Sequence, residues 1–208
     1  ECHHSMVKAA SSAGLGLAAV RNITTHHLQM DVEELSAAVV EDVRKGFYPL
    51  MIVATMDTTG AGAIDPIADI RIIANQYGCW LHADAAYGGA LTLHMNYCDL
   101  LRGIETADSI TFDAHKWLSV PMGAGMFITQ HLQIMHRAFR IEADYMPKEA
   151  QHMPVTDPFT HSLQWSRRFI GLKLYLSLLF YGWKGLATLV QRQIEIGAYF
   201  RQQLNHRN

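Results

Sequence analysis

Hydrophobic runs alternate with amphipathic stretches along most of the chain. The run "PLMIVATM" (49–56) is continuously apolar and is bounded by turn residues, which is typical of a buried parallel strand. The stretches "CWLHADAAY" (79–87), "DSITFDAH" (108–115) and "GAGMFIT" (123–129) predict three further strands. The pattern therefore predicts a sheet built from strands that follow one another at regular intervals.

Helices are predicted between these strands. The clearest is "MDVEELSAAVVEDVRKG", where Asp31 is expected as the N-cap, Glu34 completes a capping box and Gly46 ends the helix. The remaining assignments are a helix from Ser5 that ends at Gly14 or Gly16, helices over 66–78 and 98–107, and a strand approach at "LAAVRNI" (17–23).

The alternation of strands and helices predicts an α/β fold with a mostly parallel, doubly wound sheet that carries helices on both faces. From Gln130 onward the pattern changes to a helix, a polar loop around 145–160 and a long helical tail. Open α/β sheets bind ligands outside the carboxyl ends of their strands. That rule selects the loops 57–62, 84–89 and 113–116 as the place for a site.

Composition narrows the classes of function. The chain has 208 residues, of which 50% are hydrophobic, and a net charge of −2, so it can bury a core and has no basic footprint for nucleic acid or anionic lipid. Its three cysteines lack CxxC spacing, which argues against a disulfide framework or a zinc site and favours the cytoplasm. The most apolar run, 169–181, is short for a membrane span and contains Lys173. No metal motif is visible.

Two charged residues lie at predicted strand ends. Asp84 and Lys116 each have an ordinary explanation, the first as a turn or cap residue and the second as a lysine whose amine reaches solvent. Together they suggest a cofactor that needs both groups. Pyridoxal phosphate (PLP) is such a cofactor, because it takes a lysine amine for its Schiff base and a carboxylate at its ring nitrogen.

The segments "HADAAYGG", "DAHKW" and "SRRFIGLKLY", in this order, resemble the group II PLP-dependent amino acid decarboxylases. That family includes the aromatic amino acid, glutamate and 2,4-diaminobutyrate decarboxylases, and the resemblance runs along essentially the whole chain. It implies a large domain of fold type I, whose C-terminal part is residues 1–140. Residues 141–160 would form a mobile catalytic loop, and 161–208 a helical segment leading to a small domain that is absent here.

The resemblance assigns the residues around the ring. Lys116 corresponds to the Schiff-base lysine and Asp84 to the partner of the pyridinium nitrogen. Ala86 would lie against one face of the ring. His3 would stack on the other face and help to orient the substrate carboxylate, with His4 as the competing candidate.

The resemblance also assigns residues around the ring substituents. Thr59 corresponds to a threonine near the 3-hydroxyl group, although Thr58 is one residue away and an ordinary turn explains either one nearly as well. His115 resembles a histidine that contacts the phosphate. Asp113 replaces the asparagine of the aromatic decarboxylases; it must face away or be held by another donor, and we leave it out of the phosphate site.

Tyr145 lies 29 residues after Lys116 (145 − 116), like the loop tyrosine that protonates the carbanion after CO2 leaves. The implied reaction is α-decarboxylation of an L-amino acid in a homodimer whose active sites lie at the subunit interface. Two alternatives stay open: transamination or oxidative deamination to an aldehyde on the same scaffold, and a noncatalytic scaffold or dimerisation fragment. The identity of the amino acid is not predicted.

Overall fold

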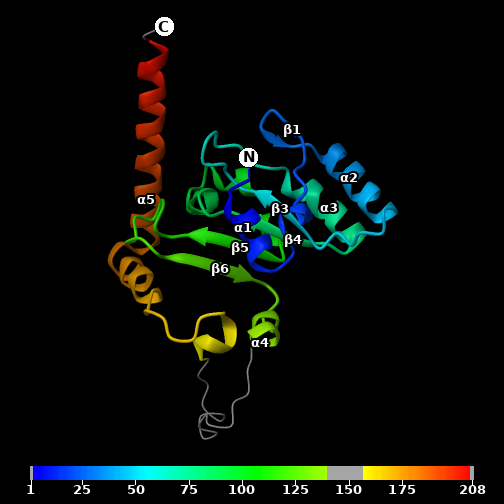
Figure 1. Ribbon diagram of the computed structural model, residues 1–208. Coiled ribbons are helices and arrows are strands. Elements are labelled where there is room, and N and C mark those ends of the chain that lie inside the picture. The colour runs from blue at the N-terminus through cyan, green and yellow to red at the C-terminus, as the bar shows by residue number, and fades with distance from the viewer. Residues whose placement is uncertain (1, 140–156, 207–208) are drawn as a thin grey trace, which may run out of the picture.

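A four-stranded sheet forms the centre of the computed structural model, which describes residues 2–139 and 157–206 (Figure 1). Its strands are β3 (Met51–Thr55), β4 (Trp80–Asp84), β5 (Ser109–Asp113) and β6 (Gly125–Thr129), and they lie side by side in that order. The first three are parallel, and β6 is antiparallel to β5. The four predicted strands and the α/β class with a mostly parallel sheet are confirmed. Within the described residues, each strand therefore lies next to the strand that follows it in the sequence.

Helices α2 and α3 begin and end close to the predicted positions, whereas α1 ends at Ser12, before the predicted Gly14 or Gly16. Asp31 caps α2, because its carboxylate accepts hydrogen bonds from the backbone N–H groups of Glu33 (2.9 Å) and Glu34 (3.1 Å). The predicted N-cap is therefore confirmed. The α-helices are α1 (Ser5–Ser12), α2 (Val32–Arg44), α3 (Ile67–Tyr77), α4 (Ile134–Phe139) and α5 (Gly171–Asn205).

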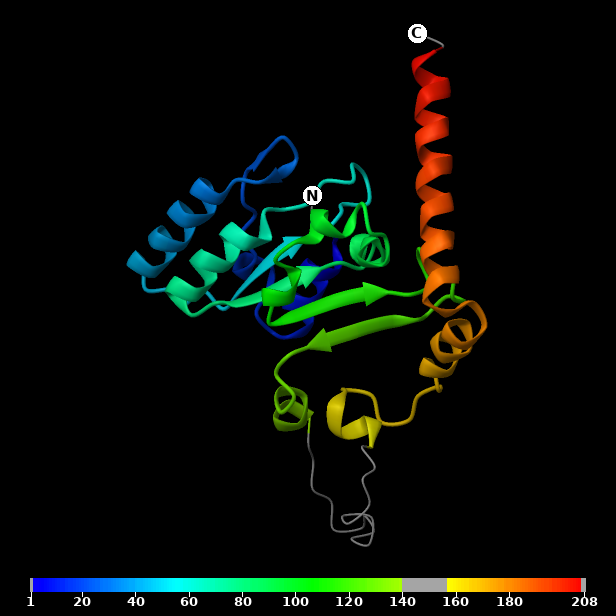
Figure 2. The ribbon, with the colours of Figure 1, turned by 180° about the vertical axis from the view of Figure 1, so that it is seen from behind.

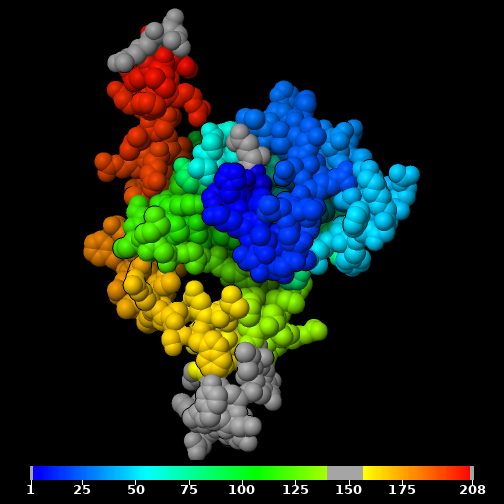
Figure 3. Space-filling model, viewed as in Figure 1, coloured from blue at the N-terminus to red at the C-terminus, as the bar shows by residue number. Residues whose placement is uncertain are grey.

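One face of the sheet carries the main hydrophobic core. Because side chains alternate along a strand, Leu81 and Ala83 of β4 point to the same face, and both are fully buried. They share one cluster with Ile70 and Ala74 of α3. On the other face of the sheet lies α1, and the space-filling view shows the N-terminal segment over the middle of the molecule (Figures 1, 2 and 3).

The strand approach predicted at 17–23 is wrong. Leu17–Ala19 form a short 3-10 helix, because no strand of the sheet lies beside this run and an apolar run alone does not specify a strand. The small hairpin of β1 (Thr25–His26) and β2 (Gln29–Met30) follows instead. Its turn places His27 and Leu28 at φ +50° and +68°. Turns of this kind usually contain glycine, and the sequence has none at these two positions.

The helix predicted over 98–107 is two short 3-10 helices, η3 (Cys98–Leu101) and η4 (Ile104–Thr106). Gly103 separates them at φ +96°, which a continuing α-helix cannot contain. The long tail is also interrupted, since Gly182 in α5 has non-helical backbone angles. No helix in the described part of the chain has the length and apolarity that a bilayer crossing requires.

Candidate functional site

The carboxyl edge of the sheet brings the predicted residues together. Asp84 ends β4 and Asp113 ends the neighbouring strand β5. The backbone N–H of Asp113 donates to the carbonyl of Ala86 (3.2 Å), so the two strand ends are joined directly. Lys116 follows in a turn in which its N–H donates to the carbonyl of Asp113 (3.1 Å). The rule that ligands bind at this edge therefore selects residues that do lie close to one another.

Lys116 forms an ion pair with the residue three positions before it. Its Nζ lies 3.1 Å from Oδ2 of Asp113, and the lysine side chain is 32% exposed. Asp113 was left out of the site on sequence grounds, and the structure shows what holds it: the lysine amine. An i, i+3 spacing across a turn was the signal in the sequence that could have indicated this pair.

His115 is oriented by its surroundings. Its Nδ1 accepts a hydrogen bond from the backbone N–H of Ala124 (3.2 Å), so the neutral ring carries its proton on Nε2. That Nε2 lies 3.8 Å from Oδ2 of Asp113. The side chain of His115 is mostly buried and presents one N–H donor beside Lys116.

Asp84 is a buried carboxylate, 7% exposed. Its Oδ1 accepts a hydrogen bond from the backbone N–H of Ala86 (3.2 Å), and this is its one hydrogen bond within the described residues. The other oxygen, Oδ2, has no hydrogen bond in the described residues and is not completely enclosed, so it can accept a further hydrogen bond. Asp84 is therefore suited to receive an N–H from a bound group.

The segment before α1 lies near this carboxylate. Cys2 is exposed overall, but partial burial of its thiol raises its pKa, and the negative charge of Asp84 raises this pKa further. Adjacent to Cys2, Nδ1 of His3 pairs with the hydroxyl of Ser5 (2.8 Å). His4 is the N-cap of α1 and makes no side-chain capping bond. Both histidines are exposed, and the choice between them stays a prediction.

The two candidate threonines have different surroundings. Thr58 is buried and fixes the loop, since its Oγ1 accepts a hydrogen bond from the N–H of Ala63 (3.1 Å). Thr59 is exposed, and its side chain makes no hydrogen bond within the described residues. The ordinary turn role therefore belongs to Thr58, which leaves Thr59 available to a ligand.

Asp57 begins one of the loops selected from the sequence, but it was given no role there. It follows β3, is 8% exposed, and has φ +93°, a strained conformation for a residue with a side chain. Burial raises its pKa from 3.8 to about 6. Gly88 permits this arrangement, because a Cβ there would lie 2.4 Å from Cβ of Asp57. The signal in the sequence that could have indicated this residue was its position, as a charged residue between a buried strand and the "TTG" loop.

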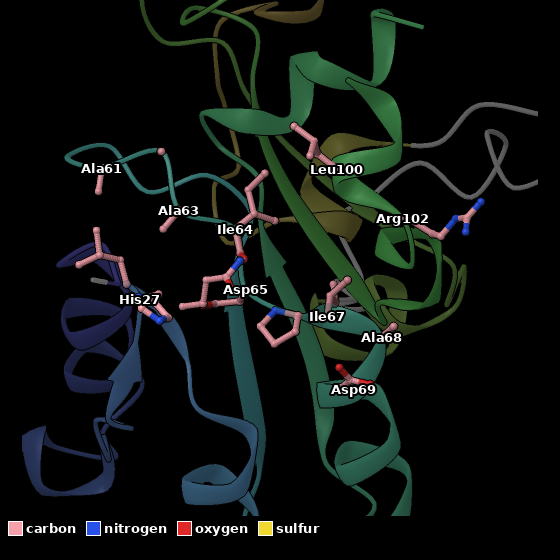
Figure 4. A pocket seen from close by; sticks show the side chains of 14 residues that line it. His27, Ala61, Ala63, Ile64, Asp65, Ile67, Ala68, Asp69, Leu100 and Arg102 are labelled. Carbon is pink, nitrogen blue, oxygen red and sulfur yellow. The ribbon is translucent and has the colours of Figure 1, made fainter. Parts of the chain in front are cut away.

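A separate pocket lies between the β1–β2 hairpin and the start of α3 (Figure 4). Ala61 and Gly62 of the loop that contains Thr59 border it, and Arg102 lies on its far side. None of the residues predicted for the cofactor or substrate lines this pocket. Tyr145 lies outside the described residues, so its predicted role has no structural account here.

A mostly parallel α/β sheet with a lysine and an aspartate at neighbouring strand ends is the framework of a PLP enzyme of fold type I. The whole sequence, residues 1–208, matches the family described as "Pyridoxal-dependent decarboxylase conserved domain". The chain belongs to this family, whose cofactor is PLP.

Curated relatives and solved structures agree with this assignment. Aspartate 1-decarboxylase of Aliivibrio fischeri is 35% identical over 199 residues, which are 95% of this chain and 36% of the relative. L-2,4-diaminobutyrate decarboxylase of Acinetobacter baumannii is 34% identical over 93% of this chain and 38% of its own length. The structure of mouse CSAD superposes with a TM-score of 0.88 at 28% identity, covering 98% of this chain and 42% of that one. The chain thus spans less than half the length of these relatives.

Proposed function

We propose that the protein is a PLP-dependent carboxy-lyase that converts an L-amino acid to the corresponding amine and CO2. The observation that carries this proposal is the position of Lys116 and Asp84 at adjoining strand ends on one edge of the sheet. Membership of the decarboxylase family supports the reaction type.

The residues present fit the cofactor. Asp84 has an oxygen without a hydrogen bond in the described residues, which suits the protonated ring nitrogen of PLP. Lys116 supplies the amine for covalent attachment, and the N–H of His115 suits a phosphate oxygen. Ala86 and His3 would border the two ring faces, and Thr59 the 3-hydroxyl group. When bound, PLP supplies the electron sink for cleavage of the Cα–carboxylate bond.

The protein's own groups then hold charges and protons in place. The negative charge of Asp84 keeps the ring nitrogen protonated, because loss of that proton would leave a buried carboxylate unpaired. Asp113 holds the Lys116 ammonium at the edge of β5 when no cofactor is attached. Tyr145 would deliver the proton to Cα from a loop at 141–160 that excludes water.

Product analysis tests the reaction type. The purified protein is incubated with PLP and, separately, with aromatic, acidic and diamino acids. We expect one class to give equal amounts of CO2 and amine. Keto acid without CO2 would instead indicate transamination, and aldehyde with ammonia would indicate oxidative deamination. We expect Tyr145→Phe to lower amine formation by about 10²-fold or more while PLP binding is retained.

The relatives suggest which amino acids to test first. Similar proteins act, by their names, on aspartate, 2,4-diaminobutyrate and tyrosine, so all three belong in the panel. Absence of turnover with every amino acid, in protein that binds PLP, would contradict the proposed reaction.

We also propose a homodimer with its active sites at the subunit interface. The support is α5, whose large apolar side chains remain uncovered, including Phe180 at 81% and Trp183 at 70% exposure. Exposed apolar surface of this kind marks interaction sites. Sedimentation analysis should give twice the monomer mass, and a monomer at micromolar concentration would contradict the proposal.

The cytoplasm is the proposed compartment, supported by three cysteines that form no disulfide. Detection of the protein in a secreted or periplasmic fraction would contradict it.

A further inference from the structure

A row of hydrogen-bonded side chains lies beside Asp84 on the polar face of the sheet. Trp80, His82 and Asp84 alternate along β4, so all three point to the face opposite the hydrophobic core. His82 is 7% exposed, which is unusual for a histidine with no assigned role.

Both ring nitrogens of His82 are engaged by hydroxyl groups of the neighbouring strand. Nδ1 lies 2.8 Å from Oγ of Ser109, and Nε2 lies 3.1 Å from Oγ1 of Thr111. The indole N–H of Trp80 donates to the same Ser109 oxygen (2.8 Å). Hydroxyl groups can donate or accept, so a neutral imidazole is satisfied at both nitrogens and its orientation is fixed.

The strand register connects this row to Asp84. His82 stands opposite Ser109, and Asp84 stands opposite Thr111, one step further along the same ladder. Thr111 is therefore the β5 residue in register with Asp84, and its hydroxyl group also hydrogen-bonds the imidazole. His82 and its two hydroxyl partners join β4 to β5 on the face where Asp84 projects.

The charge state of His82 also matters to Asp84. Burial lowers the pKa of His82, and the nearby Asp84 carboxylate opposes this without reversing it. In the part of the chain that the structure describes, Asp84 is the one charged group that opposes this shift, and the hydrogen-bond partners of His82 are uncharged hydroxyl groups. A protonated imidazole here would compete for the negative charge of Asp84, whereas a neutral one leaves it available.

We propose that His82 is a positioning residue for Asp84: held by hydroxyl groups at both ring nitrogens, it fixes Thr111, the β5 residue in register with Asp84, and leaves the Asp84 carboxylate to the ring nitrogen of PLP. This inference rests on the proposed function.

A matched pair of threonines tests it. Thr55 and Thr111 flank Asp84 in register on β3 and β5, but Thr111 alone hydrogen-bonds His82 in the described residues. Thr111→Val and Thr55→Val make the same change in size and polarity. We expect Thr111→Val to weaken PLP binding about five- to tenfold, the effect of one lost hydrogen bond, and Thr55→Val less than twofold.

The primary readout is the dissociation constant of PLP, measured by equilibrium dialysis. The absorption band of the bound cofactor, followed from pH 6 to 9, should change its pH dependence in Thr111→Val and in His82→Phe. His82→Gln, which can still contact Thr111, should restore part of the affinity lost in His82→Phe. Thermal melts without PLP identify any variant that fails to fold. If a His82 variant fails to fold, the comparison of Thr111→Val with Thr55→Val tests the proposal alone.

Equal PLP affinities in the two threonine variants, or an unchanged spectrum in His82→Phe, would overturn the positioning role. Failure of the wild-type protein to bind PLP at all would instead overturn the proposed function, and this inference with it.

Discussion

The two faces of β4 differ in what they do. Leu81 and Ala83 point into the core against α3 and are completely buried. On the opposite face His82 and Asp84 are almost equally buried, yet they carry polar and charged groups. Five consecutive residues of one strand thus present apolar side chains to the core on one side and polar or charged groups on the other.

The two faces of β4 differ in what stabilises their buried side chains. The apolar face gains stability from every buried carbon atom, at about 25 cal/mol per Å² removed from water. The polar face gains little from burial, because each polar group must first recover the hydrogen bonds that it loses to water. The imidazole of His82 recovers its bonds within the protein, whereas the carboxylate of Asp84 accepts one hydrogen bond in the described residues. The incomplete satisfaction of Asp84 is what suits it to a ligand.

Replacing Asp84 should cause the largest functional change. We expect Asp84→Ala to lower kcat/KM for decarboxylation by about 10²–10³-fold, because the ring nitrogen loses its preorganised anionic partner. The free energy of unfolding should change by less than about 1.5 kcal/mol, since the carboxylate loses a single hydrogen bond, the one from the N–H of Ala86. Steady-state kinetics and urea titration measure the two effects. Activity within tenfold of wild type would remove Asp84 from the site.

A change on the apolar face of the same strand should lower the stability of the protein and leave its PLP affinity unchanged. We expect Leu81→Ala to reduce the free energy of unfolding by about 2–5 kcal/mol, through lost burial and a cavity. The PLP affinity of the folded fraction should stay unchanged. Ile72→Ala is the control, since Ile72 is 65% exposed on α3 and its removal should cost less than about 0.5 kcal/mol. A loss of affinity in Leu81→Ala would show that the two faces are coupled.

Asp57 should give a smaller, pH-dependent effect. Its pKa is raised by burial from 3.8 to about 6, so the folded state holds the proton more tightly than the unfolded state. Stability should therefore be complete below about pH 4 and should fall as pH rises toward about 6. Asp57→Asn removes this dependence and should gain about 1–3 kcal/mol at pH 7, but nothing at pH 3.5.

Asp57→Gly also relieves the strain of φ +93° and should gain about 1 kcal/mol more. Urea titrations at several pH values measure both variants. A gain that is equal at pH 3.5 and pH 7 would show that strain, and not charge, is what Asp57 contributes.

The main strands and helices could be predicted from the sequence because their signals are local. A continuous apolar run specifies β3, and a capping aspartate specifies the start of α2. The β1–β2 hairpin could not be predicted, since His27 and Leu28 adopt positive φ angles without a glycine. Nor could the 3-10 helices between β4 and β5 be distinguished from an α-helix by their composition.

The candidate site was predicted in part. Lys116, Asp84, His115 and Ala86 lie at one edge of the sheet, as the rule for α/β folds requires. The ion pair of Lys116 with Asp113 depends on the geometry of one turn. The row of His82 depends on the register of two strands 27 residues apart in sequence, which no local pattern encodes.

Reductive trapping tests the central claim most directly. The protein is incubated with PLP, treated with borohydride and digested, and the modified peptide is identified by mass spectrometry. We expect a single phosphopyridoxyl group on Lys116 and no labelling in Lys116→Ala, while Lys173→Ala is labelled like wild type. A label on another lysine, or a label that persists in Lys116→Ala, would contradict the assignment of this amine to the cofactor.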